Sequence, residues 1–196
     1  YRIKGVLWYQ GEENRLRARQ YRKLFPALIG DWRKNWNQGS FPFYFAQIAP
    51  FEYADEQKNL AAELREAQLL TMQTVINTGM VATTDVGEVD NLAFGNKSVV
   101  ANRLFLWAMA KDYGRINTVY SGPIYESMVV ERDKIRIMFE HLGQGLMVTG
   151  FQAIKGFEIA GEDKVFYPAK GVIERNTVLL GSGNVPFPVA ARFAWE

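Results

Sequence analysis

The sequence predicts an α/β fold over residues 1–114, with a parallel sheet and flanking helices, followed by an all-β region over residues 115–196. Two observations carry this prediction. In the first part, short apolar runs alternate with amphipathic helical stripes, which is typical of βαβ crossovers and therefore of parallel strands. In the second part, short strand-like runs follow one another between turn residues, without a helical period.

The first part begins with a buried strand expected over residues 3–9, an apolar run that ends in a polar loop at residues 10–14. A helix is expected over residues 15–36, where apolar residues recur at i, i+3 and i+4 and Pro26 marks a bend or a restart. The second strand is expected over residues 43–48, an aromatic run flanked by prolines.

A long helix is expected over residues 59–77, because this segment is rich in Leu, Ala and other strong helix formers. A third strand is expected over residues 80–85 and a third helix over residues 97–113, with Gly114 as its C-cap. Three strands are few for a covered parallel sheet. We therefore expect further strands of this domain to precede Tyr1.

The all-β region consists of short apolar runs separated by Gly, Asn and Asp turn residues, which is typical of antiparallel strands. The expected strands cover residues 128–131, 134–139, 146–148, 157–159, 165–167, 172–173, 177–180 and 189–194.

Composition excludes several functions. The chain has 23 basic and 21 acidic side chains, so its charge does not indicate nucleic-acid binding, and no apolar run approaches the ~20 residues of a membrane span. It has no Cys, which excludes disulfides, thiolate metal sites and a Cys nucleophile. The single histidine, His141, is expected in a turn of the all-β region, with a structural or solvated role.

Polar side chains follow each expected strand of the first part, where ligands bind in open parallel sheets. Loops are polar wherever they face solvent, so composition alone favours solvent-exposed loops without a binding function. The candidates are Gln10, Gly11, Glu12, Glu13 and Asn14 after the first strand, Gln47 after the second, and Asp85, Glu88, Asp90 and Asn91 after the third.

The segment Gly5–Asn14, which contains the motif W-Y-Q-G-E-E-N, resembles the strand-and-loop block of the sialate O-acetylesterase family of SGNH hydrolases. Further blocks are similar to that family in the same order, so the resemblance covers essentially the whole chain. They are residues 21–29, 41–45, 64–68, 79–81, 85–87, 96–97, 104–108, 156–161 and 188–195.

The resemblance implies an SGNH, flavodoxin-like sheet and a serine esterase that removes O-acetyl groups from sugars such as sialic acid. It implies Gln10 as oxyanion donor, Asp90 as catalytic aspartate, and Gly11, Glu12 and Asp85 as substrate-binding residues. It implies no cofactor and no metal, and it suggests an extracellular or periplasmic location.

The sequence departs from the family pattern in two respects. The family's nucleophile belongs to a G-x-S block before the segments found here, so we expect a preceding N-terminal segment of the same protein to complete the fold. The family's D-x-x-H motif aligns with Asp90 and Ala93, which puts alanine at the histidine position. We therefore expect this chain alone not to hydrolyse acetyl esters.

Two other functions remain open from the sequence. One is a non-catalytic sugar-binding or structural descendant of the esterase, which Ala93 favours. The other is a glycosidase that uses a carboxylate pair such as Glu12 and Asp85. The cationic helix over residues 15–36 is either a solvated surface or an attractive surface for an acidic sugar.

Overall fold

The computed structural model describes residues 1–53, 59–91, 95–148 and 154–195. The chain divides into two compact units, Tyr1–Tyr120 and Ser121–Trp195. The domain boundary expected between residues 114 and 115 stays a prediction. Within the described ranges, no helix combines the length and the apolar character needed to cross a membrane.

The first unit contains a three-stranded parallel sheet of order β1-β2-β3, which confirms the predicted α/β class. Its strands are β1 (Val6–Tyr9), β2 (Phe43–Ala46) and β3 (Thr78–Val81). The third strand begins and ends earlier than expected, because its register is set by pairing of Phe43 with Thr78 and of Ala46 with Val81. Residues 84–86 form a turn instead.

Helices connect the strands: the 3₁₀ helix η1 (Glu12–Arg17), α1 (Ala18–Trp36), α2 (Leu60–Thr74) and α3 (Lys97–Lys111). α1 continues through Pro26 without a restart. The α1 helix ends at Asn37, whose left-handed backbone lets its N–H donate to the carbonyl oxygen of Arg33.

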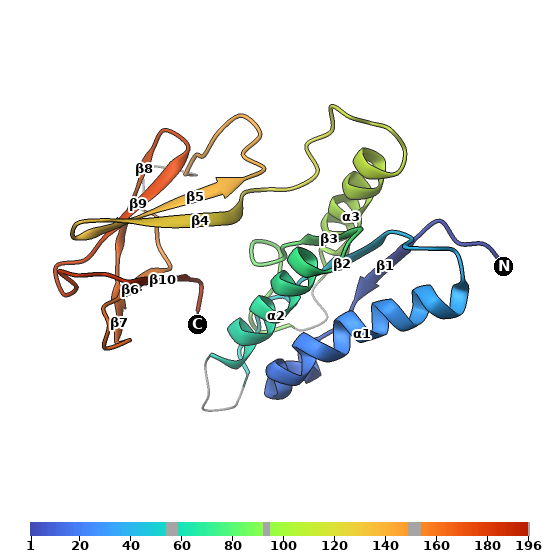
Figure 1. Cartoon of the computed structure of the whole chain (residues 1–196), viewed down its shortest axis with the longest axis horizontal. Helices are drawn as coiled ribbons and strands as arrows, with labels where there is room; N and C mark the ends of the chain where they lie inside the picture. Colours follow the sequence, from blue (N-terminus) through green and yellow to red (C-terminus); the bar gives the residue numbers. More distant parts are fainter. Residues whose placement is uncertain (54–58, 92–94, 149–153, 196) are drawn as a thin grey trace. The chain divides into compact units, whose positions relative to one another are not determined.

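The central strand β2 is buried on both faces, and its side chains alternate between two cores. Phe43 and Phe45 pack in one core with side chains of α1 and α2, whereas Tyr44 and Ala46 pack in the other with side chains of α3. Helices therefore cover both faces of the sheet (Figure 1). In open α/β sheets, ligands bind beyond the carboxyl ends of the strands.

The second unit is all-β, and its two antiparallel sheets have the orders β4-β5-β9-β8 and β10-β6-β7. Both sheets contribute to one core, with Ile135 and Leu180 from the first sheet and Ile159 from the second fully buried. Its strands are β4 (Ile124–Glu131), β5 (Lys134–Glu140), β6 (Phe157–Ala160), β7 (Phe166–Pro168), β8 (Lys170–Glu174), β9 (Thr177–Gly181) and β10 (Ala190–Phe193).

The prediction of a strand over residues 146–148 is wrong, because this segment has no strand structure. It follows the turn at residues 143–144, and Leu146 packs against the core of the second unit. Leu146 therefore packs on the core from an unpaired segment, whereas Met147 is exposed.

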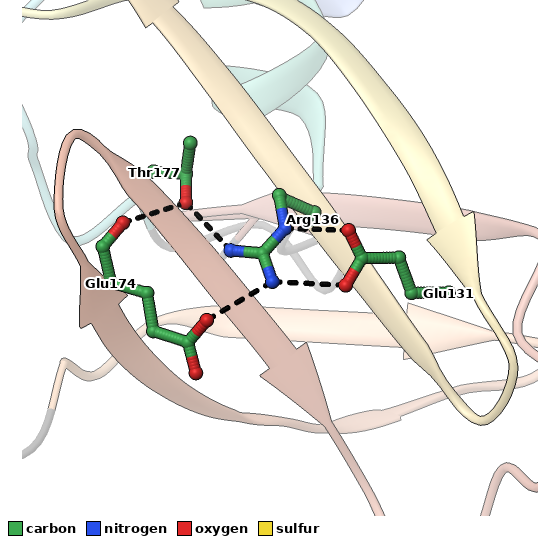
Figure 2. A network of polar contacts seen from close by, with 4 residues as sticks. All are labelled: Glu131, Arg136, Glu174 and Thr177. Atoms are coloured by element: carbon green, nitrogen blue, oxygen red, sulfur yellow. Dashed lines mark hydrogen bonds and ion pairs between the residues drawn. The ribbon is translucent and has the colours of Figure 1, made fainter.

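One arginine forms hydrogen bonds and ion pairs across the strands of the larger sheet of the second unit (Figure 2). Arg136 of β5 donates to both carboxylate oxygens of Glu131, at 2.6 and 2.9 Å, and to Glu174 and Thr177 at 3.0 and 2.8 Å. The bonds to Arg136 hold the pKa of the Glu131 carboxyl below its usual range. This network joins β4, β5, β8 and β9 on the surface of the sheet.

Candidate functional site

The loop after β1 presents an amide at the carboxyl edge of the parallel sheet. Gln10 follows β1 directly, and η1 begins two residues later at Glu12. The short helix brings Asn14 back towards Gln10, whose Nε2 donates to Asn14 Oδ1 at 2.7 Å. The backbone N–H of Asn14 donates to the carbonyl oxygen of Gly11 at 2.7 Å and closes the turn. An amide has two N–H donors, so one bond to Asn14 leaves a donor for another acceptor.

A fully buried glutamine of α2 anchors this loop. Gln68 Nε2 donates to the carbonyl oxygens of Gln10 and Ala46, both at 3.4 Å, and its Oε1 accepts from the N–H of Ile48 at 2.9 Å. These bonds join the carboxyl ends of β1 and β2 to α2. Because an unpaired amide would be costly in this interior, Gln68 specifies one arrangement of the two strand ends.

Gly11 is where the loop comes closest to the core. Its φ is +157°, and a Cβ there would lie 2.8 Å from Ile48 Cγ2 and 3.2 Å from Gln68 Nε2. A Cβ at Gly11 would force the Ile48 side chain, and to a lesser degree Gln68, to move, so the close approach of the loop favours glycine.

Gly11→Ala is therefore expected to lower the free energy of unfolding by about 1–3 kcal/mol, because Ile48 and Gln68 must move to admit a methyl group. Urea unfolding monitored by circular dichroism checks this. Gly30→Ala is the matched control, since no neighbouring atom lies within 4 Å of a Cβ there. Because Gly30 lies within a helix, this substitution should raise the free energy of unfolding by about 0.5–1 kcal/mol. Equal stability of parent and Gly11→Ala would contradict the crowding argument.

Two tyrosines stand beside the Gln10 loop. Tyr9 ends β1, and its pKa is raised to about 12, mainly by burial and then by the charge of Glu12. Burial and Glu12 also raise the pKa of Tyr53. Arg15 lies over the Tyr53 ring at 3.9 Å, and Lys97 Nζ lies 5.4 Å from the centre of the Tyr9 ring. Both phenols stay protonated at neutral pH and can donate hydrogen bonds.

Asp85, in the turn after β3, forms an ion pair with Arg103 of α3. Arg103 Nη1 and Nη2 contact Asp85 Oδ1 and Oδ2 at 2.7 and 2.5 Å, and Nη1 also donates to the carbonyl oxygen of Ala82 at 2.6 Å. The bonds from Arg103 hold the pKa of the Asp85 carboxyl below its usual range. A glycosidase general acid requires the opposite shift, so this geometry disfavours the Glu12–Asp85 carboxylate pair.

Arg103→Met should destabilise the protein modestly at pH 7, by less than about 1 kcal/mol, because the pair is largely exposed. The lowered pKa of Asp85 means that its stabilisation is present above about pH 4 and is lost as pH falls through the folded-state value. Urea unfolding should show a larger difference between parent and variant at pH 7 than near pH 2, where only the bond from Arg103 to the carbonyl oxygen of Ala82 still separates them. Arg19→Met, at an exposed position of α1, is the control.

The loop after β3 continues towards Asp90, which is exposed. Glu88 and Asn91 form an isolated bridge around it, and the N–H of Glu52 donates to the carbonyl oxygen of Val89 at 2.6 Å. Ala93 lies outside the described residues.

Parallel pairing brings together the loops that carry the candidate residues. β1 and β3 flank β2 in the same direction, so Gln10, Gly11 and Glu12 share an edge of the sheet with Asp85 and Asp90. Glu12 lies in the first turn of η1, with its side chain half-buried.

Part of the cationic surface of the first helix is used structurally. Arg22 pairs with Glu66 of α2, and Arg33 donates to the carbonyl oxygens of Phe41 and Asn77 at 2.8 and 3.0 Å. Together with Arg15 on Tyr53, these contacts favour a structural role for those three arginines over attraction of an acidic sugar.

His141 belongs to the second unit, directly after β5, and its Nε2 lies 3.9 Å from a carboxylate oxygen of Glu140. Its backbone is left-handed, with φ 56°, as expected for a turn. Across the residues that the structure describes, no cluster of three His, Asp or Glu side chains is arranged to hold a metal ion.

Sequence reasoning missed the role of Gln68 and the ion pair of Arg103. Gln68 lies four residues after Leu64 on the buried face of α2, and a polar residue at such a position signals a buried hydrogen bond. No comparable signal in the sequence pointed to Arg103, because it is distant from Asp85 along the chain and contacts it only in the folded structure.

The α/β fold with candidate residues at the carboxyl ends of a parallel sheet is compatible with many enzyme classes, and comparisons with known proteins select one of them, the carbohydrate esterases. A family model described as "Carbohydrate esterase, sialic acid-specific acetylesterase" matches residues 1–106. The chain belongs to this family.

Similar proteins are named as acetylesterases too. The chain is 35% identical to the sialate O-acetylesterase of Mus musculus over 140 residues, which cover 62% of this chain and 26% of the relative. It is 33% identical to that of Homo sapiens over 144 residues, which cover 64% and 27%. The crystal structure of a carbohydrate acetylesterase from Xanthomonas citri matches with a TM-score of 0.93 and 35% identity, over 100% of this chain and 46% of that one. The chain thus spans about a quarter to a half of these proteins.

Proposed function

We propose that this chain contributes the oxyanion side of a carbohydrate O-acetylesterase site, with an O-acetylated sugar such as sialic acid as substrate. Attack of a serine hydroxyl on the acetyl carbonyl turns the carbonyl oxygen into an oxyanion, which needs donors aimed at it. Gln10 supplies such a donor through its side-chain amide. Asp90 has the role of the carboxylate that orients the general base.

The observation that carries the proposal is the anchoring of the Gln10 loop. Bonds to Asn14 and Gln68 hold the loop at the carboxyl edge, and Gly11 lets it approach the core closely. A donor that is already oriented costs no reorganisation when charge develops, which is the physical basis of oxyanion stabilisation.

Three further residues are proposed to contact the sugar. Gly11 leaves room beside the reacting group, and Glu12 and Asp85 accept hydrogen bonds from hydroxyl groups. The bidentate pair with Arg103 occupies one lone pair on each Asp85 oxygen, and each oxygen has a second.

The alternative function is a non-catalytic sugar-binding descendant of the esterase. Alanine at position 93, where the family motif has histidine, favours it, because alanine cannot accept a proton.

The test of the proposal compares this chain with the product of its complete open reading frame. The chain alone should hydrolyse p-nitrophenyl acetate and O-acetylated sialic acid no faster than a matched inert protein, because an oxyanion donor without an attacking group gives little. Turnover by the longer product carrying Ala93→His, with none by the chain, supports the proposed role. Steady turnover by the purified chain would contradict it, and tight sugar binding without turnover by either would establish the alternative.

A further inference from the structure

The second unit contains an open pocket of ≈ 470 Å³, which lies within the size range of small-molecule sites. Two segments form it: the turn after β6, with Glu162 and Asp163, and the loop before β10, with Asn184 and Phe187. Tyr167 of β7 also lines the pocket. None of these residues takes part in the proposed esterase site.

The backbone of the pocket is held by short hydrogen bonds. The N–H of Val189 donates to the carbonyl oxygen of Ala160 at 2.8 Å and joins the two segments. Asp163 Oδ1 accepts from the N–H of Val165 at 3.1 Å, which fixes the turn. Val185 anchors the other loop in the core, where it is 4% exposed. The walls are therefore formed before any ligand arrives.

The lining combines a flat apolar surface with hydrogen-bonding groups. Phe187 lines the pocket and is 80% exposed, so its ring is accessible to a ligand there. Tyr167 adds a second aromatic ring. Glu162 and Asp163 supply acceptors for hydroxyl groups, and Asn184 supplies both donors and acceptors. A sugar ring, with one face of C–H groups and a rim of hydroxyls, matches this set.

The charge of the lining selects among sugars. It contains two carboxylates and no Lys or Arg, and Lys164, the next residue along the turn, does not line the pocket. A carboxylate-bearing sugar such as sialic acid would be repelled by Glu162 and Asp163, whereas the hydroxyls of a neutral sugar gain charge-assisted hydrogen bonds from them.

We propose that this pocket binds a neutral sugar ring of a glycan, with Phe187 stacked on the C–H face of the ring and Glu162, Asp163 and Asn184 bonded to its hydroxyls. The chain belongs to a carbohydrate esterase family, so a glycan is a ligand of the class that this family acts on. The inference concerns binding alone and does not rest on the proposed esterase activity.

The test is a two-dimensional NMR titration of the ¹⁵N-labelled chain with cellotetraose and xylotetraose, which are neutral. The acidic probe is N-acetylneuraminic acid, and the cationic probe is a glucosamine tetramer. At least one neutral probe should shift the amide signals of Gly161, Asn184 and Phe187 with a Kd on the order of 1 mM, since an open pocket leaves much of a ligand in water. The acidic probe should bind at least tenfold more weakly.

Phe187→Ala should weaken binding of the neutral probe about tenfold or more while leaving the rest of the spectrum unchanged, because an exposed side chain contributes little to stability. Tyr125→Ala, at an exposed aromatic residue of β4 outside the pocket lining, is the control and should bind like the parent. Three results would overturn the proposal: no shift with either neutral probe at about 10 mM, unchanged affinity of Phe187→Ala, or tighter binding of the cationic probe, which would indicate a cation pocket.

Discussion

Ala93→His, introduced into the product of the complete open reading frame, is expected to raise turnover of acetyl esters by ~10³-fold or more. Triad members act as a unit, so supplying the missing base restores nearly the whole effect when the serine is present. The same substitution in this chain alone should do almost nothing. Initial rates with p-nitrophenyl acetate, measured from pH 5 to pH 9, check both statements, and the gain should follow deprotonation of an imidazole near pH 6.5–7.

Asn102→His provides the control, because it adds a histidine at an exposed position of α3 outside the D-x-x-H pattern. It should leave turnover unchanged. If the product with alanine at position 93 already reached ordinary turnover numbers of ~1–10³ s⁻¹, Asp90 and Ala93 would not form the remnant of a triad, and the base would lie elsewhere.

Gln10→Ala should lower kcat by ~10²–10³-fold in whichever form of the protein turns over the ester, with alanine or histidine at position 93. An oxyanion donor acts in the transition state, so kcat should fall much more than KM rises. Gln10→Glu should be at least as inactive, because a carboxylate repels the developing negative charge.

Gln20→Ala, at an exposed position of α1, is the matched control for Gln10→Ala and should keep full activity. Circular dichroism of both variants separates a folding defect from a catalytic one. A Gln10→Ala protein with normal kcat would remove Gln10 from the site and leave the oxyanion to another donor.

The sequence predicted the class of the fold because strong periodic signals coincide with local preference. The aromatic run at residues 43–48 became the central strand β2, and the amphipathic stripe after residue 15 became α1. The apolar triplet at residues 146–148 misled, because Leu146 packs on the core from an unpaired segment and Met147 is exposed. Alternation over so few residues does not separate a strand from an unpaired segment.

The candidate site was predictable only in part. The ends of parallel strands point to Gln10 and Asp85 without any coordinates, since topology alone brings the loops after them to one edge. The partners of these residues were not predictable. Gln68 meets Gln10, and Arg103 meets Asp85, only because α2 and α3 pack on particular positions of the sheet. Such long-range contacts depend on helix placement, which no local pattern encodes.

The buried bonds of Gln68 also determine how this edge of the sheet moves. The N–H of Ile48 lies beyond the end of β2, where peptide hydrogens usually exchange with solvent quickly, yet Gln68 accepts from it in the interior. We therefore expect this N–H to exchange more slowly than those of the exposed loops, because its exchange requires the bond to Gln68 to open. The turn at Gln10 is tied to the same side chain, because its carbonyl oxygen accepts a hydrogen bond from Gln68. If Gln10 is the oxyanion donor proposed above, it is held on a surface that is already formed before an acetyl ester arrives.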